Sequence, residues 1–309
     1  MANPEGHPVG TAELTGVELA PELTRYLPYL MRRAFAYVSA RADRSTQARD
    51  HAVLAALAAG HGSSQLALAE RLEINRTIMV KLIDRLQDQG YVTRTRNPQN
   101  RRSYLLALTD AGRRALAEMQ PAVLERDRAV TSTLTERERV RMGELLGRLL
   151  GESEQGPGPV SIEYLISQVF HLLRRRGDAL VADAGLKVRD FAALFAIAKL
   201  GPCPQQQFAR YLALTEPAAA LIVDELVDKG LVERGQDPDD RRRYALELTA
   251  AGRERLVFLT DAIDRLQAEV TAELGGPEYE GELQALIHKL LAVPVPAPTP
   301  VPSGADRAR

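Results

Sequence analysis

The chain has 309 residues, of which 45% are hydrophobic and 26% are charged, and its formal net charge is -1. This length predicts two domains, the composition is typical of globular proteins with buried cores, and the net charge excludes a uniformly basic nucleic-acid-binding chain. A single cysteine excludes an internal disulfide framework, and without an apolar run long enough for a membrane span or an N-terminal signal peptide we predict a cytoplasmic protein.

The first half of the chain predicts a series of helices followed by a β-hairpin. Residues 1–16 lack a regular pattern and are predicted to be disordered. Helices are predicted at residues 18–41, 48–59, 64–72 and 75–89. A hairpin is then predicted from Gly90 onward, because the turn NPQN favours chain reversal and the segment RSYLLALT alternates apolar with other residues. Two further helices close this half, and Thr135 with Glu138 predicts a capping box at the start of the last one.

The second half of the chain repeats the first at an offset of 140 residues. Residues 90–113 and 230–253 align without a gap, and 13 of the 24 aligned positions are identical. A repeat of this length indicates duplicated domains rather than a solenoid of short units. The corresponding helices are predicted at residues 161–184, 188–200, 204–212 and 215–229.

Composition predicts the domain boundaries. The segment GESEQGPGP at residues 151–159 combines glycine, proline and charge, which is typical of a linker. We therefore predict one domain at residues 17–150 and a second domain at residues 160–292. The proline-rich tail at residues 293–309 is predicted to be disordered or extended.

In both halves a helix, a turn, a second helix and a basic hairpin follow one another, which is the order of a winged helix-turn-helix. The second short helix of such a unit fits the DNA major groove, and arginines of the hairpin suit the electronegative minor groove. The stretches QLALAERLEINRTIMVKLIDRLQDQGYVTRTRNPQNRRSYLLALTDAGR and QFARYLALTEPAAALIVDELVDKGLVERGQDPDDRRRYALELTAAGR resemble the multiple-antibiotic-resistance regulator (MarR) family. In that family the first and last helices form a dimer interface. The resemblance therefore implies a mainly α fold with small β-hairpin wings, in which two winged helix-turn-helix domains form an intramolecular pseudo-dimer.

Polar residues of the helix pair and of the hairpins are the candidate DNA contacts. Arginine and lysine suit guanine, asparagine suits adenine, and a helix N-terminus suits phosphate. The resemblance implies that the wing arginines Arg102 and Arg242 enter the minor groove. It implies phosphate contacts for Arg101, Arg241 and Arg243. The complete set of predicted DNA-binding residues is Ser63, Ser64, Asn75, Arg76, Thr77, Lys81, Arg94, Arg101, Arg102, Thr215, Arg241, Arg242 and Arg243.

The two candidate recognition helices differ in charge. Residues 75–89 have a formal sum of +1, residues 215–229 have a sum of -3, and Leu221 stands where the first repeat has Lys81. We therefore predict that the first domain is the stronger DNA reader. The second domain is predicted either to contact thymine methyl groups or only to complete the fold. The thymine contacts are assigned to Ala218, Ala219 or Ala220.

The resemblance to the family also implies a small aromatic or phenolic effector. Tyr26, Tyr29 and Arg33 on the first long helix are its predicted ligand-binding residues, and ordinary packing between helices is the alternative interpretation. The lone cysteine, Cys203, is predicted to be a small buried residue rather than an oxidant sensor.

Other kinds of site have no signal in the sequence. The five histidines lack metal-ligand spacing, and the chain has no glycine-rich phosphate loop, nucleophile elbow or clustered carboxylate pair. We predict no metal, no cofactor and no enzymatic activity. The predicted function is sequence-specific binding of a double-stranded DNA operator by a transcriptional repressor, a monomeric chain acting as a pseudo-dimer, with higher association left open. The alternative is a protein of the same fold that no longer reads DNA well and acts as a protein-interaction or ligand-binding antirepressor module.

Overall fold

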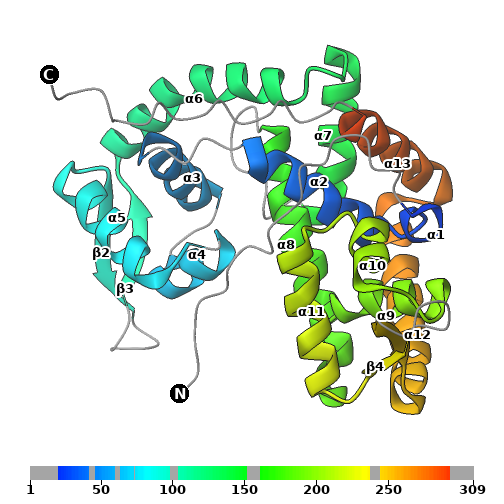
Figure 1. The fold of residues 1–309 in the computed structure, drawn as a ribbon. Coiled ribbons are helices and arrows are strands. Elements are labelled where there is room, and N and C mark those ends of the chain that lie inside the picture. Colours follow the sequence, from blue (N-terminus) through cyan, green and yellow to red (C-terminus); the bar gives the residue numbers. More distant parts are fainter. Residues whose placement is uncertain are drawn as a thin grey trace, which may run out of the picture. The chain divides into compact units, whose positions relative to one another are not determined.

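The structure is a computed structural model, and it describes residues 20–41, 46–59, 63–72, 74–97, 104–151, 161–236 and 244–292. The elements of the first repeat are α1 (Pro21–Thr24), α2 (Leu27–Arg41), α3 (Thr46–Ala59), β1 (Ser63–Ser64), α4 (Gln65–Arg71), α5 (Arg76–Asp88), β2 (Val92–Arg96), β3 (Tyr104–Leu108), α6 (Asp110–Val130) and α7 (Glu136–Leu150). Those of the second are α8 (Ile162–Val181), a 3₁₀ turn (Ala182–Ala184), α9 (Asp190–Leu200), α10 (Gln205–Tyr211), α11 (Glu216–Asp228), β4 (Val232–Gln236), β5 (Tyr244–Leu248), α12 (Ala250–Leu274) and α13 (Pro277–Leu291). The predicted fold class is confirmed, because the described chain is mostly helical with two small antiparallel hairpins (Figure 1). Among the described residues, no helix is long and apolar enough to cross a membrane.

The chain divides into two compact units that do not coincide with the two repeats. The larger unit contains residues 22–191 and 256–290, and the smaller unit contains residues 192–255. The larger unit thus holds the winged helix of the first repeat together with the first and last helices of both repeats. The smaller unit holds the winged helix of the second repeat.

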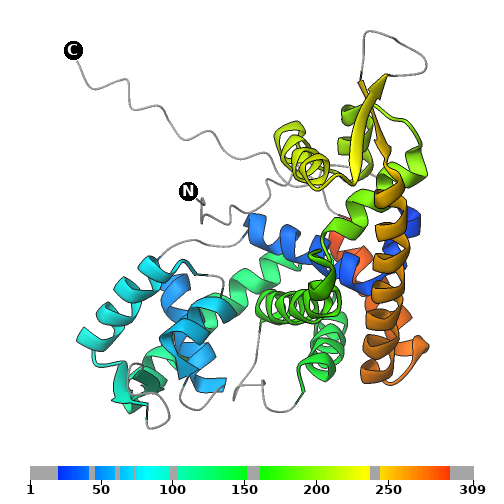
Figure 2. The same ribbon diagram turned by 90° about the horizontal axis from the view of Figure 1, so that it is seen from below.

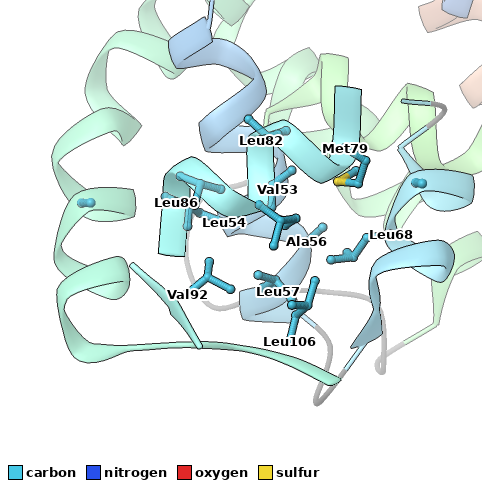
Figure 3. Close-up of a cluster of buried hydrophobic side chains, with 13 residues drawn as sticks. Val53, Leu54, Ala56, Leu57, Leu68, Met79, Leu82, Leu86, Val92 and Leu106 are labelled. Atoms are coloured by element: carbon cyan, nitrogen blue, oxygen red, sulfur yellow. The ribbon is translucent and has the colours of Figure 1, made fainter. Parts of the chain in front are cut away.

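The helix-turn-helix of the first repeat is built around an apolar core. Helix α5 turns Met79, Leu82, Ile83 and Leu86 inward, at the spacing of one helical face. These side chains pack with residues of α3 and α4 and with the hairpin, as Figure 3 shows for Val53, Leu68 and Leu106 among others. The hydrophobic pattern therefore fixes which face of α5 points to solvent.

The hairpins of the two repeats have the same register. Strand β2 pairs with β3 so that Arg94 lies opposite Leu106, and β4 pairs with β5 so that Arg234 lies opposite Leu246. In the first repeat, β1 adds a short third strand to β3. In the second repeat this strand is reduced to one bridge, in which Cys203 and Leu246 exchange two backbone hydrogen bonds of 3.2 and 2.7 Å. Each hairpin is thereby tied to the chain just before the helix pair.

The motif that ends each hairpin, leucine-threonine followed by alanine-glycine-arginine, caps the next helix and brings two backbones together. The Thr109 hydroxyl accepts from Gly112 N at 3.0 Å and donates to Gly90 O at 2.6 Å. A Cβ atom at Gly112 would lie 2.2 Å from the Tyr91 carbonyl oxygen, so only glycine fits there. Thr249 and Gly252 repeat this arrangement in the second repeat.

The prediction of one uninterrupted helix at residues 18–41 is wrong. The structure has the short helix α1, a break at Arg25 and Tyr26, and then α2. Pro28 accounts for the break, because its ring lacks an N–H group and clashes with the carbonyl four residues earlier in a continuous helix. The helix predicted at residues 161–184 ends three residues earlier, as α8 at Val181, and a 3₁₀ turn follows it. The remaining predicted helices with stated ranges agree with the structure to within two residues, and the Thr135–Glu138 capping box is confirmed.

Within the larger unit the first helices of the two repeats pack against each other. Helix α2 contacts α8, and α8 also contacts α7. Figure 2 shows the blue α2 beside the green α8, in agreement with Figure 1. Ion pairs continue this interface between α7 and α13, where Arg141 binds Glu282 at 2.8 Å and Lys289 binds Glu138 at 2.6 Å. Terminal helices of both repeats thus share one packed region.

Two residues separated by the repeat offset cap helices across this region. The buried carboxylate of Asp127 in α6 accepts a hydrogen bond from the backbone N of Glu163, in the first turn of α8, at 2.9 Å. The amide oxygen of Gln267 in α12 accepts from the backbone N of Leu27, the first residue of α2, at 2.9 Å. Each repeat therefore satisfies one of the free N–H groups at the start of the other repeat's first helix.

We expect Asp127→Ala to lower the free energy of unfolding by about 1–3 kcal/mol, because it leaves the partly buried N–H group of Glu163 without its acceptor. Asp127→Asn keeps an acceptor and removes a buried charge. Burial raises the pKa of Asp127 above its usual 3.8, although hydrogen bonds from Glu163 and Ile162 oppose the shift. With a raised folded-state pKa, the unfolded state binds fewer protons in this window, so wild-type stability falls as pH rises from 3.8 through the folded-state value.

Urea denaturation of wild type and both variants at pH 4 and pH 7 measures this effect. The asparagine variant should gain stability relative to wild type as the pH rises, while the alanine variant is the weakest at pH 7. An asparagine variant as unstable as the alanine variant at pH 7 would show that the side-chain acceptor contributes nothing.

Candidate nucleic-acid interface

The start of α5 presents the predicted major-groove residues to solvent. Asn75 precedes the helix as its N-cap, and its side-chain oxygen accepts from Thr77 N at 2.8 Å. Arg76, Thr77 and Lys81 are all exposed. Because residues four apart lie on one face of a helix, Thr77 and Lys81 share a face that is opposite the buried side chains. The structure thus brings these four predicted residues together, with the Asn75 oxygen already engaged in capping.

The predicted serine contacts lie at the start of α4. The Ser64 hydroxyl accepts from Ala67 N at 3.1 Å, so it caps this helix. The side chain of Ser63 lies outside the described residues, although its backbone pairs with Leu106 in the sheet. The structure therefore assigns Ser64 a local structural role, and phosphate binding stays a prediction.

Arg94 has a different environment from the one expected of a groove-binding side chain. Its guanidinium forms an ion pair of 2.6 Å with Asp84 of α5 and lies 3.5 Å from the Gln65 side chain. In the second repeat, Arg234 forms the same pair with Asp224 of α11. These pairs attach each hairpin to its recognition helix. Both the arginine and the aspartate recur in the sequence at the offset of 140, and this recurrence is the signal from which their pairing could have been inferred.

The tips of the two hairpins lie outside the described residues. Strand β2 ends at Arg96 and β3 begins at Tyr104. In the second repeat, β4 ends at Gln236 and β5 begins at Tyr244. The predicted wing residues in these two gaps are Arg101, Arg102, Arg241, Arg242 and Arg243.

The recognition helix of the second repeat presents a different surface. Thr215 is its N-cap and accepts from Ala218 N at 3.3 Å, so this predicted contact has a capping role like that of Asn75. Ala218 and Ala219 are buried, with 5% and 0% of their surfaces exposed, and neither can touch a base. Leu221 is 72% exposed. The prediction that Ala218 or Ala219 contacts thymine is therefore wrong, because both face the core of the smaller unit. Ala220 is half-buried, and its contact stays a prediction.

The predicted ligand residues lie in the packed helices of the larger unit. Tyr26 and Tyr29 are buried, and Tyr26 meets Phe191 edge to face at 5.4 Å between ring centroids. Arg33 is only 4% exposed, and burial lowers the pKa of its guanidinium. Nearby in sequence on the same helix, Phe35 stacks on Phe170 of α8 at 4.3 Å. The structure therefore gives these side chains places in helix packing.

Two further predictions concern reactive groups. Cys203 is fully buried, and burial raises the pKa of its thiol to about 11, as expected of a structural cysteine. Among the described residues, no group of three or more histidine, cysteine, aspartate or glutamate side chains could hold a metal ion.

Both repeats of the chain are similar in sequence to known proteins. The sequence profile of the MarR family matches residues 45–103 and 184–243. The putative transcriptional regulatory protein for the hcr operon of Thauera aromatica is 33% identical over 110 residues, which are 36% of this chain and 66% of its own length. The transcriptional repressor NicR of Pseudomonas putida is 30% identical over 130 residues, which are 40% of this chain and 80% of its own length. A crystal structure of a probable transcriptional regulator from Pseudomonas aeruginosa has 31% identity and a TM-score of 0.35, and covers 40% of this chain and 96% of that chain.

Proposed function

Because the chain belongs to the MarR family of transcriptional regulators, we propose that it is a repressor that binds one operator with both winged helices of a single polypeptide. The exposed face of α5, with Arg76, Thr77 and Lys81, carries this proposal. Its donors suit base edges in the major groove, and its opposite face is fixed by the core. The name of the related repressor NicR supports repression rather than activation.

The packing of the terminal helices supports a pseudo-dimer. In the family two chains meet through their first and last helices, and here α2 packs on α8 and α7 bonds to α13 within one chain. The covalent fusion supplies both halves at equal concentration. We infer that one chain occupies both half-sites of an operator, with the first repeat as the stronger reader.

Light scattering of the complex with a selected operator duplex tests this stoichiometry. We expect a minimal complex of one chain on one duplex, with footprints over two successive major grooves about 34 Å apart. Two chains that each place only their first repeat on the DNA would contradict the proposal. Two chains on a site twice as long would not, because each would still span its own pair of half-sites.

The Ala-rich α11 favours a second candidate function, in which the protein has lost most DNA reading and acts as an antirepressor. Salt titration separates the two. A repressor that neutralises several phosphates loses affinity steeply as salt rises, with a logarithmic slope near -0.9 per phosphate contact. Absence of measurable binding to any selected or random duplex, even at low salt, would favour the antirepressor.

We propose in addition that a small aromatic acid controls DNA binding from the helix packing around Arg33. Arg33 and Tyr29 are both buried in this packing, and a guanidinium is the donor best suited to a carboxylate. An aromatic carboxylate suits both the guanidinium of Arg33 and the ring of Tyr29. We expect one such acid to raise the melting temperature and lower operator affinity, while its neutral methyl ester does neither. A panel of acids that changes neither property would exclude the effector, since a ligand preferring one state must shift the equilibrium.

A further inference from the structure

The recognition helices α5 and α11 end at equivalent glycines and bind their hairpins through equivalent ion pairs. Each is followed by a glycine with positive φ, 74° at Gly90 and 68° at Gly230. Each of these glycines donates a 2.8 Å hydrogen bond to the last turn of its helix. The hairpin arginine binds the aspartate at the same register in both repeats, Asp84 and Asp224. Positions separated by 140 residues therefore occupy the same place on the two helices.

On this common face the second repeat has lost its hydrogen-bond donors. Glu216 replaces Arg76, Pro217 replaces Thr77 and Leu221 replaces Lys81. The acids that remain are engaged within the unit, since Glu216 accepts a 3.0 Å hydrogen bond from Gln206 and Asp224 binds Arg234. Hydrogen-bond reading of bases by this part of α11 is thus largely removed.

Leu221 is the large apolar side chain on this face, next to the smaller exposed ring of Pro217. Its neighbour positions Ala218 and Ala219 face the core, whereas 72% of Leu221 is exposed. In the first repeat the equivalent position is an exposed lysine that is predicted to reach a base edge. A side chain at that place meets the floor of the major groove, where the C5 methyl group of thymine is the principal apolar feature.

We propose that Leu221 is the specificity-determining residue of the second repeat and that it reads the methyl group of one thymine in the weaker half-site. This inference rests on the proposed operator binding and names the base chemistry that α11 recognises. It predicts that the methyl group itself is read, independently of the hydrogen-bonding edge of the base.

Base analogues test the methyl group directly in the full chain. Each thymine of the weaker half-site of a selected operator is replaced singly by deoxyuridine, which lacks only the C5 methyl. We expect one position at which wild type loses affinity about fourfold, the value for one buried methyl-sized group. Cytosine at that position should bind weakly, and 5-methylcytosine should recover part of the loss because it restores the methyl. Leu221→Ala should bind the thymine and deoxyuridine duplexes equally, as a double-mutant cycle requires.

Three outcomes would overturn the inference while leaving the proposed function intact. They are a half-site without a methyl-sensitive position, methyl sensitivity that persists in Leu221→Ala, and a cytosine preference that Glu216→Gln abolishes. The last would assign reading to an acid that accepts from cytosine N4. Failure of wild type to prefer any duplex over random DNA would instead refute the proposed function, so the two failures are distinguishable.

Discussion

Replacing Arg76 and Lys81 together with alanine is expected to lower operator affinity by about thirtyfold or more. Each side chain that contacts a base edge contributes about 1–3 kcal/mol of discrimination, and 1.4 kcal/mol is tenfold in affinity. Both side chains are exposed on α5, so the fold should be unaffected. Fluorescence anisotropy at fixed moderate salt measures the affinity, and thermal denaturation checks the fold.

The second repeat supplies the matched control for this experiment. Glu216 occupies the position of Arg76, and Glu216→Ala should leave affinity unchanged or tighten it, because an acid near phosphates is repulsive. The converse pair, Glu216→Arg with Leu221→Lys, should tighten binding and make the selected motif more symmetric. A strict palindrome selected by wild type, with equal losses from both helices, would contradict the asymmetry.

Gly112→Ala is expected to destabilise the first winged helix by about 3 kcal/mol, at the upper end for overpacking. The added Cβ would lie 2.2 Å from the Tyr91 carbonyl oxygen, a backbone atom that also accepts from Thr109 N at 3.1 Å. The chain can relieve this contact only by moving the hairpin away from α6. Gly252→Ala should act in the same way on the smaller unit, where the distance to Leu231 O would be 2.0 Å.

Gly281 provides a control for the effect of adding a methyl group to a helix. It is exposed in α13, and a Cβ there would meet no atom within 4 Å. Gly281→Ala should therefore stabilise the protein by up to about 1 kcal/mol, the propensity difference between the two residues. Hydrogen exchange of the hairpin amides and urea denaturation measure the two effects. A Gly112→Ala protein as stable as Gly281→Ala would contradict the close approach.

The parts of the fold that were predicted from the sequence are those with local signals. Hydrophobic spacing predicted most helices, the NPQN turn and the repeat at the offset of 140 predicted both hairpins, and Thr135 with Glu138 predicted the capping box. The break before α2 had a local signal in Pro28, but the apolar periodicity on both sides of it outweighed that signal. Packing of the terminal helices into one unit depends on contacts between distant segments, and no local pattern encodes it.

The candidate site was predicted less completely than the fold. Arg76 and Lys81 were predicted as base contacts because of their residue types, and both are exposed in the structure. Arg94 was assigned to DNA because it is basic and lies in a hairpin, whereas its partner Asp84 is ten residues away on another element. Burial of Ala218 could have been inferred only by fixing the helix phase, since alanine is compatible with either face.

The two hydrogen bonds by which Asp127 and Gln267 cap a helix of the other repeat have a consequence for how the sequence can evolve. In a regulator made of two identical chains, any change in α6 appears twice, so its two counterparts must always be the same residue. Here Asp127 and Gln267 perform the corresponding task with different chemistry, one carboxylate and one amide. In a fused chain the two repeats that contact each other are encoded separately, so a mutation in one repeat can be compensated by a mutation in the other. The two halves can therefore diverge in sequence, and replacing either by a duplicate of the other would change one of these two hydrogen bonds between the repeats.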